Sequence, residues 1–230
     1  DHKFFVNAPV TVVDAFGAFP GCGSGNCWRT ILVSGLGGGA QGVFALDITD
    51  PTLLTEDNVA NVVLWEFTDF DDPLTTTQVE GNKELGLIMG QPSIVRLANG
   101  QWAAGFGNGY NSTQDEDNDG NGTGDCAEYG NGDPRCTASS TGSAVLFMLD
   151  IVTGQPIKTI NTGVNYTHDP FFSGVDKRPN GLSEVAVIDV EGDAIVEYIY
   201  VGDLFGNLWK FDITSSSSAN WKIAYNSASC

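Results

Sequence analysis

The chain has 230 residues, of which 41% are hydrophobic, enough for one large domain with an apolar core. Its 29 acidic residues against 10 Lys and Arg give a net charge of −19. This balance argues against nucleic acids and anionic lipid surfaces as partners, because both are bound by clusters of Lys and Arg. It suits an exported protein that binds cations, or one that only needs solubility in a salty medium.

A repeated pattern of short strands predicts an all-β fold. Each of three units contains a strand, a glycine-rich turn and a strand ending in an apolar-Asp-Ile sequence, and flanking strands complete the unit. The predicted strands are residues 10–13, 29–35, 43–49 and 62–67 in the first unit, 92–97, 102–109, 145–151 and 156–161 in the second, and 184–190, 198–203, 207–214 and 221–225 in the third.

Four strands per unit make one propeller blade, so we expect residues 1–230 to form a single β-propeller domain or part of one. The Asp that follows the second strand of each hairpin is expected to cap a turn by accepting backbone N–H groups. These residues are Asp47, Asp150 and Asp212. Helix content should be low, with at most a short helical turn within residues 53–61, and no stretch is long and apolar enough to span a membrane.

The five cysteines favour disulfides. Cys22 and Cys27 flank a Gly-rich loop, Cys126 and Cys136 bracket a polar one, and Cys230 is left over. A zinc site is disfavoured because the cysteine spacings are unsuitable and the chain has only two histidines. Because the sequence starts at Asp1 without a signal peptide, we expect a piece of a mature, exported protein.

A long insertion, residues 111–142, interrupts the hairpin of the second unit and contains an acidic run. Two registers of a calcium loop fit this run, one beginning at Asp115 and the other at Asp117, and the second is favoured because the first lacks a closing carboxylate. The alternative is a solvated, disordered acidic loop. The candidate calcium ligands of the insertion are Asp115, Asp117, Asp119, Asn121, Thr123 and Asp125.

A second acidic loop, residues 189–197, leads into the strand pair of the third unit. Side-chain oxygens stand at loop positions 1, 3, 5 and 9, and a backbone carbonyl falls at position 7, the spacing with which a short loop wraps a hard cation. The alternative is an ordinary strand connection whose acidic side chains face water. The candidate ligands are Asp189, Glu191, Asp193 and Glu197, with the carbonyl of Ile195.

Several segments resemble the PilY/PilC family of type IV pilus tip-associated adhesins. They are residues 28–30 with the glycine run 35–42, then residues 45–51, 64–67, 105–112, 180–183 and 200–212, in the order found in that family. The resemblance implies a modified β-propeller on the C-terminal side of a larger exported protein, with a calcium loop at residues 189–197. The family usually carries Asp at the third and ninth loop positions, where this chain has Glu191 and Glu197.

The resemblance implies a non-enzymatic, calcium-binding module for adhesion and type IV pilus biogenesis or control. Its partners would be type IV pilus subunits (minor pilins) and a surface or host ligand, and its location the cell surface or the pilus. The alternative is a fragment of a quinone-cofactor (PQQ-type) dehydrogenase propeller, suggested by the blade ending at residues 149–154. That alternative is disfavoured because such enzymes usually carry a vicinal cysteine pair, which this sequence lacks.

Overall fold

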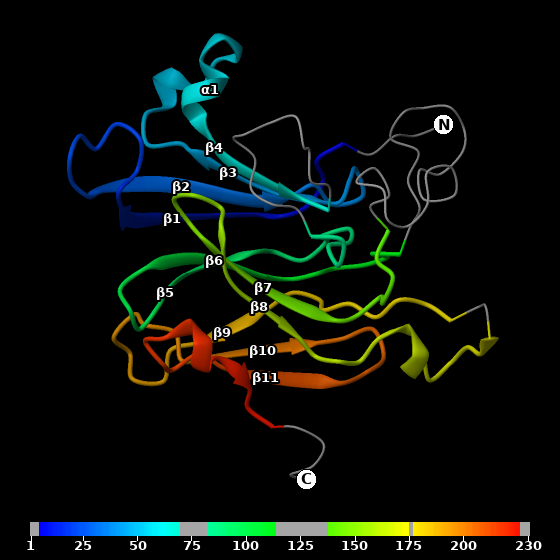
Figure 1. The fold of residues 1–230 in the computed structure, drawn as a ribbon. Coiled ribbons are helices and arrows are strands. Elements are labelled where there is room, and N and C mark those ends of the chain that lie inside the picture. The colour runs from blue at the N-terminus through cyan, green and yellow to red at the C-terminus, as the bar shows by residue number, and fades with distance from the viewer. Residues whose placement is uncertain (1–4, 70–81, 114–137, 175–176, 226–230) are drawn as a thin grey trace.

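The computed structural model describes residues 5–69, 82–113, 138–174 and 177–225 as three four-stranded antiparallel sheets stacked one on another (Figure 1). The first sheet contains β1 (Val10–Gly17), β2 (Cys27–Gly35), β3 (Gly42–Asp47) and β4 (Val63–Thr68). The second contains β5 (Ser93–Arg96), β6 (Trp102–Gly107), β7 (Val145–Asp150) and β8 (Pro156–Asn161). The third contains β9 (Ala186–Ile188), β10 (Tyr198–Gly202), β11 (Leu208–Asp212) and β12 (Lys222–Ile223).

Each sheet is a meander in which neighbouring strands follow one another along the chain. This arrangement confirms the three predicted four-stranded units. The first strands of neighbouring sheets lie in contact, β1 with β5 and β5 with β9. In the described residues the helical elements are short: η1 (Pro51–Leu53), η2 (Glu56–Asn58), α1 (Val59–Val62), η3 (Tyr166–His168) and η5 (Ser218–Asn220). Elements η2 and α1 correspond to the one helical turn predicted within residues 53–61, whereas η1 begins before that range.

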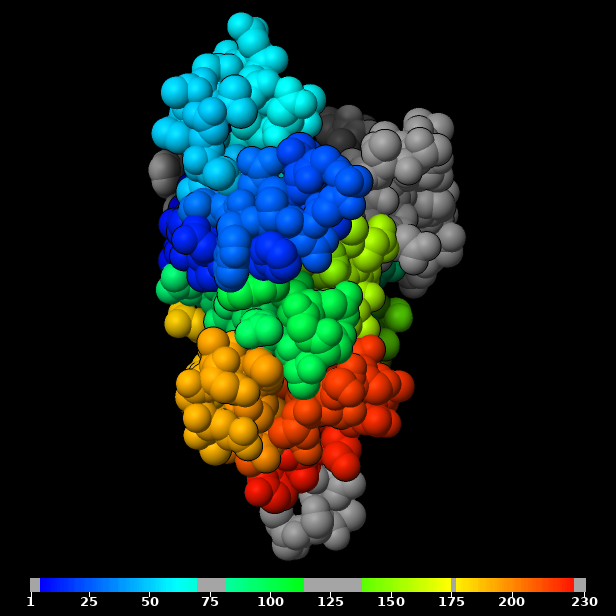
Figure 2. Space-filling view, turned by 90° about the vertical axis from the view of Figure 1, so that its left-hand side faces the viewer, coloured from blue at the N-terminus to red at the C-terminus, as the bar shows by residue number. Residues whose placement is uncertain are grey.

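The middle sheet is buried on both faces, which explains the continuous apolar sequence of β7. Side chains alternate along a strand, so Phe147 and Leu149 join the core shared with the first sheet, while Leu146 and Met148 join the core shared with the third. The layers are also apparent from the side (Figure 2). The described residues therefore form two cores, one on each side of the second sheet.

The first core is centred on three phenylalanines from different strands. Phe67, Phe106 and Phe147 are all nearly inaccessible to solvent, and their ring centroids lie 5.3–6.2 Å apart in tilted and edge-on arrangements. Aromatic rings favour these geometries over face-to-face stacking because of their quadrupoles. This cluster fixes the first sheet against the second.

The Asp residues that end the hairpins cap turns as the sequence predicts. Asp47 Oδ1 accepts a hydrogen bond from the N–H of Thr49 (3.0 Å), and Asp212 Oδ1 accepts one from the N–H of Thr214 (3.1 Å). Asp150 Oδ1 accepts from the N–H groups of Val152 and Thr153. One residue type thus performs the same task in all three sheets.

The third sheet is shorter than its sequence pattern predicts. Strand β12 pairs with β11 at only two positions, although residues 221–225 read as a strand. Trp221 precedes β12, and its buried ring donates a hydrogen bond from Nε1 to the carbonyl of Ser215 (2.7 Å). Its apolar character therefore reflects side-chain packing rather than strand pairing.

The insertion connects β6 to β7, as expected, and its two described ends meet. The N–H of Ser139 donates a hydrogen bond to the carbonyl of Ser112 (2.7 Å), which closes the base of the excursion. The candidate ligands in residues 115–125, the Cys126–Cys136 pair and Cys230 lie outside the described residues. The predicted Cys22–Cys27 disulfide is present, with a Cα–Cα distance of 5.6 Å.

Among the described residues, no helix combines the length and the apolar character that crossing a membrane would require.

Candidate metal centre

The acidic loop 189–197 joins two antiparallel strands of the third sheet. Ile188, the last residue of β9, pairs with Tyr198, the first residue of β10. Asp189 and Glu197 are therefore the first residues beyond the paired strands, and the N–H of Glu197 donates to the carbonyl of Ile188 (3.0 Å). The hairpin geometry places the first and last candidate ligands of the loop next to each other.

Three of the four candidate carboxylates gather in this loop. One oxygen each from Asp189, Asp193 and Glu197 lies within 4.8 Å of the other two. Glu191 is exposed and stands outside this cluster, and the carbonyl of Ile195 stays a predicted ligand. A set of oxygen donors alone suits a hard divalent cation such as Ca²⁺ better than a metal that prefers nitrogen or sulfur.

Hydrogen bonds to Asp189 shape the loop. Its Oδ1 accepts from the N–H of Gly192 (2.6 Å) and its Oδ2 accepts from the N–H of Ala194 (2.7 Å). Burial raises the pKa of Asp189, but the backbone N–H groups of Ala194, Gly192, Asp193 and Glu191 together outweigh it and bring the pKa below its usual value. Asp189 is therefore ionised at neutral pH.

The two other carboxylates are also held by backbone groups. Glu197 Oε2 accepts from the N–H of Val190 (2.7 Å), and Asp193 Oδ1 accepts from the N–H of Ile195 (2.9 Å). Each carboxylate has four lone-pair sites, so these bonds leave acceptor capacity for a cation. The loop thus presents three oriented negative charges in a small volume.

The tight path of the loop requires left-handed backbone at two positions. Gly192 has φ +76° and Ala194 has φ +64°. Glycine adopts this conformation without penalty, whereas an L-residue with a Cβ pays about 1–2 kcal/mol. Ala194 occupies loop position 6, where calcium loops of the EF-hand type need glycine for a sharp turn. The loop therefore makes the turn of a cation-binding loop, at the cost of strain at Ala194.

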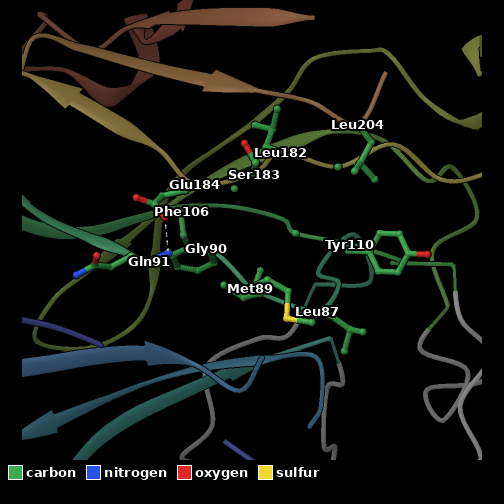
Figure 3. A pocket seen from close by; sticks show the side chains of 14 residues that line it. Leu87, Met89, Gly90, Gln91, Phe106, Tyr110, Leu182, Ser183, Glu184 and Leu204 are labelled. Carbon is green, nitrogen blue, oxygen red and sulfur yellow. Dashed lines mark hydrogen bonds between the residues drawn. The ribbon is translucent and has the colours of Figure 1, made fainter. Parts of the chain in front are cut away.

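The structure also contains a pocket that the sequence does not predict. An apolar pocket of about 330 Å³ lies between the segments that lead into the second and third sheets (Figure 3). Its walls come from residues 87–91, 106–107, 109–110, 181–184 and 204, and these segments are far apart in the sequence. No local motif could have indicated it.

Comparison with known proteins connects this geometry to one family. The family described as the PilY1 beta-propeller domain matches residues 1–132 and 131–228. A type IV pilus biogenesis factor PilY1 homolog of Xylella fastidiosa is 36% identical over 227 residues, covering 97% of this chain. The type IV pilus biogenesis factor PilY1 of Pseudomonas aeruginosa PAO1 is 31% identical over 213 residues, covering 92%. The chain spans 12% and 13% of the lengths of these two relatives.

A solved structure agrees with the sequence matches. The crystal structure of the Pseudomonas aeruginosa PilY1 C-terminal domain superposes with a TM-score of 0.60 at 27% identity, covering 99% of this chain and 39% of that one. The three sheets are therefore propeller blades, and the predicted all-β propeller fold is confirmed. On the extent of the family match and the shared fold, this chain belongs to the PilY1 beta-propeller domain family.

Proposed function

We propose that this chain is a non-enzymatic, calcium-binding propeller module of a type IV pilus biogenesis factor. The calcium assignment rests on the clustering of Asp189, Asp193 and Glu197, whose oxygens lie within 4.8 Å of one another in the loop that connects β9 and β10. The pilus assignment is supported by relatives that are type IV pilus biogenesis factors. We place the module at the pilus tip or the cell surface, where calcium is available.

The proposed ion would bind beside β9, which is the shortest of the strands that begin the three sheets. Strand β9 has only three residues, and its pairing with β10 ends at Ile188, directly beside the carboxylate cluster. A divalent cation would neutralise the mutual repulsion of Asp189, Asp193 and Glu197 and hold the two strand ends together. Calcium binding and release would then shift the hairpin between an ordered and a loosened state.

The protein partners follow from the same assignment. We propose that the module contacts type IV pilus subunits, the minor pilins among them, and a ligand on another surface or host. Calcium would set how much of the third sheet is ordered for these contacts. Pilus control then operates through the stability of one hairpin rather than through catalysis.

Thermal unfolding with and without calcium tests the proposal. A ligand at 100 times its Kd stabilises the folded state by about 2.7 kcal/mol, which for a chain of this size raises Tm by about 5–10 °C. Asp193→Ala should remove most of this rise. Asp57→Ala, which removes an exposed carboxylate in η2, should retain it. Equal Tm values in saturating calcium and in chelator would exclude the calcium switch.

A cellular assay separates the pilus role from ion binding. In bacteria that make the native protein with Asp193→Ala, we expect fewer surface pili than with Asp57→Ala. If calcium raises Tm in vitro but both variants give normal piliation, the ion is structural and the control role is wrong.

A further inference from the structure

The apolar pocket is open, and one carboxylate stands at its wall. Met89, Tyr110 and Leu204 line it and are each 42–52% exposed, whereas Phe106 and Leu182 are buried behind them. Glu184 also lines the pocket, and its Oε2 accepts a long hydrogen bond from the N–H of Gln91 (3.4 Å; Figure 3). The site therefore suits an apolar group that carries a cation beside it.

The back of this pocket is rigid because backbone segments pack directly on one another. A Cβ atom on Gly181 would lie 1.8 Å from the carbonyl oxygen of Gly109, and one on Gly107 would lie 2.5 Å from Cβ of Leu182. The N–H of Gly109 also donates to the carbonyl of Leu182 (3.0 Å). A preformed pocket of this kind loses little conformational entropy when it is filled.

A loop on the same chain presents a matching group. We call Asp169, Phe171, Phe172 and Arg178 the aromatic loop, which lies at the right-hand edge of the view in Figure 1. Phe171 is 69% exposed and Phe172 is 47% exposed. Two neighbouring phenylalanines this exposed are unusual, because burying such a side chain is worth about 1.5–3 kcal/mol. Their exposure indicates a surface that binds a partner.

Asp169 accepts hydrogen bonds from the other residues of the aromatic loop. Its buried carboxylate accepts from the N–H groups of Phe171 (2.9 Å) and Arg178 (2.9 Å) and from Nε of Arg178 (3.2 Å). The hydrogen bond from the Arg178 side chain, aided by these backbone groups, lowers the pKa of Asp169 far below its usual value despite burial. Asp169 therefore links Phe171 and Arg178 through one carboxylate.

Arg178 places a positive charge beside the exposed rings. Its guanidinium carbon lies 4.6 Å from the ring centroid of Phe172 and 5.4 Å from that of Phe171. Nε and Nη2 bind Asp169, and Nη1 carries two further N–H donors. The Arg178 side chain is 44% exposed, so it can pair with a second carboxylate.

We propose that the pocket of one copy of this chain receives Phe172 from a second copy, while Arg178 pairs with Glu184. The apolar pocket and its wall carboxylate complement the ring and its adjacent guanidinium in both polarity and charge. Each copy carries a net charge of −19, so copies repel unless a local cation meets a local anion. The aromatic loop and the pocket supply that pairing.

Sedimentation equilibrium over a range of protein concentrations measures this association. Wild type should associate reversibly, and Phe172→Ser or Met89→Arg should each weaken association by at least about 30-fold, as loss of an interface hot spot does. Phe5→Ser and Leu208→Arg, at positions 78% and 75% exposed outside both surfaces, should associate like wild type. Glu184→Gln should weaken association. A change in salt concentration does not test the Arg178–Glu184 pair by itself, because salt also screens the repulsion between the two negatively charged copies.

Mixing the two damaged variants gives the decisive result. Phe172→Ser keeps an intact pocket and Met89→Arg keeps an intact aromatic loop, so a mixture should form dimers of twice the 24.4 kDa chain mass that neither variant forms alone. Unchanged melting curves would show that both variants are folded. A wild-type chain that stays monomeric at several hundred micromolar, or association that survives both substitutions, would overturn the proposal.

Discussion

Replacement of Asn108 by Ala tests how the second and third sheets are joined. Asn108 follows β6 and is fully buried. Its Nδ2 donates to the carbonyls of Glu84 (2.8 Å) and Ser143 (2.8 Å), and its Oδ1 accepts from the N–H groups of Val145 (2.9 Å) and Leu182 (3.0 Å). The amide therefore uses its full hydrogen-bonding capacity to connect β7, the entry to β5 and the entry to β9.

Asn108→Ala leaves four backbone groups without this partner. Each orphaned group costs about 1–3 kcal/mol, so the loss is about 4 kcal/mol even at the minimum, and more if water does not fill the space. Urea unfolding followed by circular dichroism measures the difference as a shift in the midpoint at constant slope. A loss below about 1 kcal/mol would refute the view that Asn108 connects the sheets.

Asn108→Asp separates hydrogen bonding from shape. A carboxylate fits the same space and accepts from Val145 and Leu182, but its second oxygen faces the carbonyls of Glu84 and Ser143. Burial and these carbonyls raise the folded-state pKa of the new carboxyl above its unfolded value of about 3.9. The destabilisation should be full above the folded pKa and should diminish as pH falls toward 4. A deficit independent of pH would contradict this reasoning.

Three further substitutions probe local features. Ala194→Gly relieves about 1–2 kcal/mol of backbone strain but adds about 0.5–1 kcal/mol of unfolded-state entropy, so Tm in chelator should rise slightly, and a fall would contradict the strain. Gly154→Ala should cost about 2–5 kcal/mol of stability, because Gly154 has φ +71° and a Cβ there would lie 2.6 Å from Cγ of Trp65. Gly163→Ala should cost only about 1–2 kcal/mol, because Gly163 has a similar φ but open space around it. Equal losses of stability for the two variants in chemical denaturation would exclude the clash with Trp65. Burial raises the pKa of Asp203, but hydrogen bonds from side chains and the backbone outweigh burial and bring the pKa below its usual value. The ionised Asp203 therefore stabilises the folded state above pH about 4, and this contribution is lost in acid. Asp203→Ala should flatten the pH dependence of Tm between pH 5 and 2, and an unchanged slope would count against this.

Much of the fold could be predicted because the strands are short, apolar and bounded by turn residues. The predicted strand 156–161 coincides with β8, and the Asp caps of the hairpins form as expected. The predictions fail at edges where apolar residues pack without pairing. Trp221 is the example, because its burial satisfies the hydrophobic pattern although β12 begins after it.

The candidate site was only partly predictable for a related reason. Alternate spacing indicated that Asp189 and Asp193 would converge, and they do. That spacing could not show that Glu191 stands apart, since this depends on the left-handed turns at Gly192 and Ala194. The pocket depends on contacts between distant segments, which leave no local signal.

Calorimetric titration of calcium into the chelated protein tests the central claim most directly. We predict binding heat from the Asp189–Glu197 loop that disappears in Asp193→Ala and persists in Asp57→Ala, while Asp119→Ala removes a separate site if the insertion also binds calcium. An Asp193→Ala isotherm identical to that of wild type, or no heat from wild type at millimolar calcium, would contradict the assignment of this loop as a calcium site.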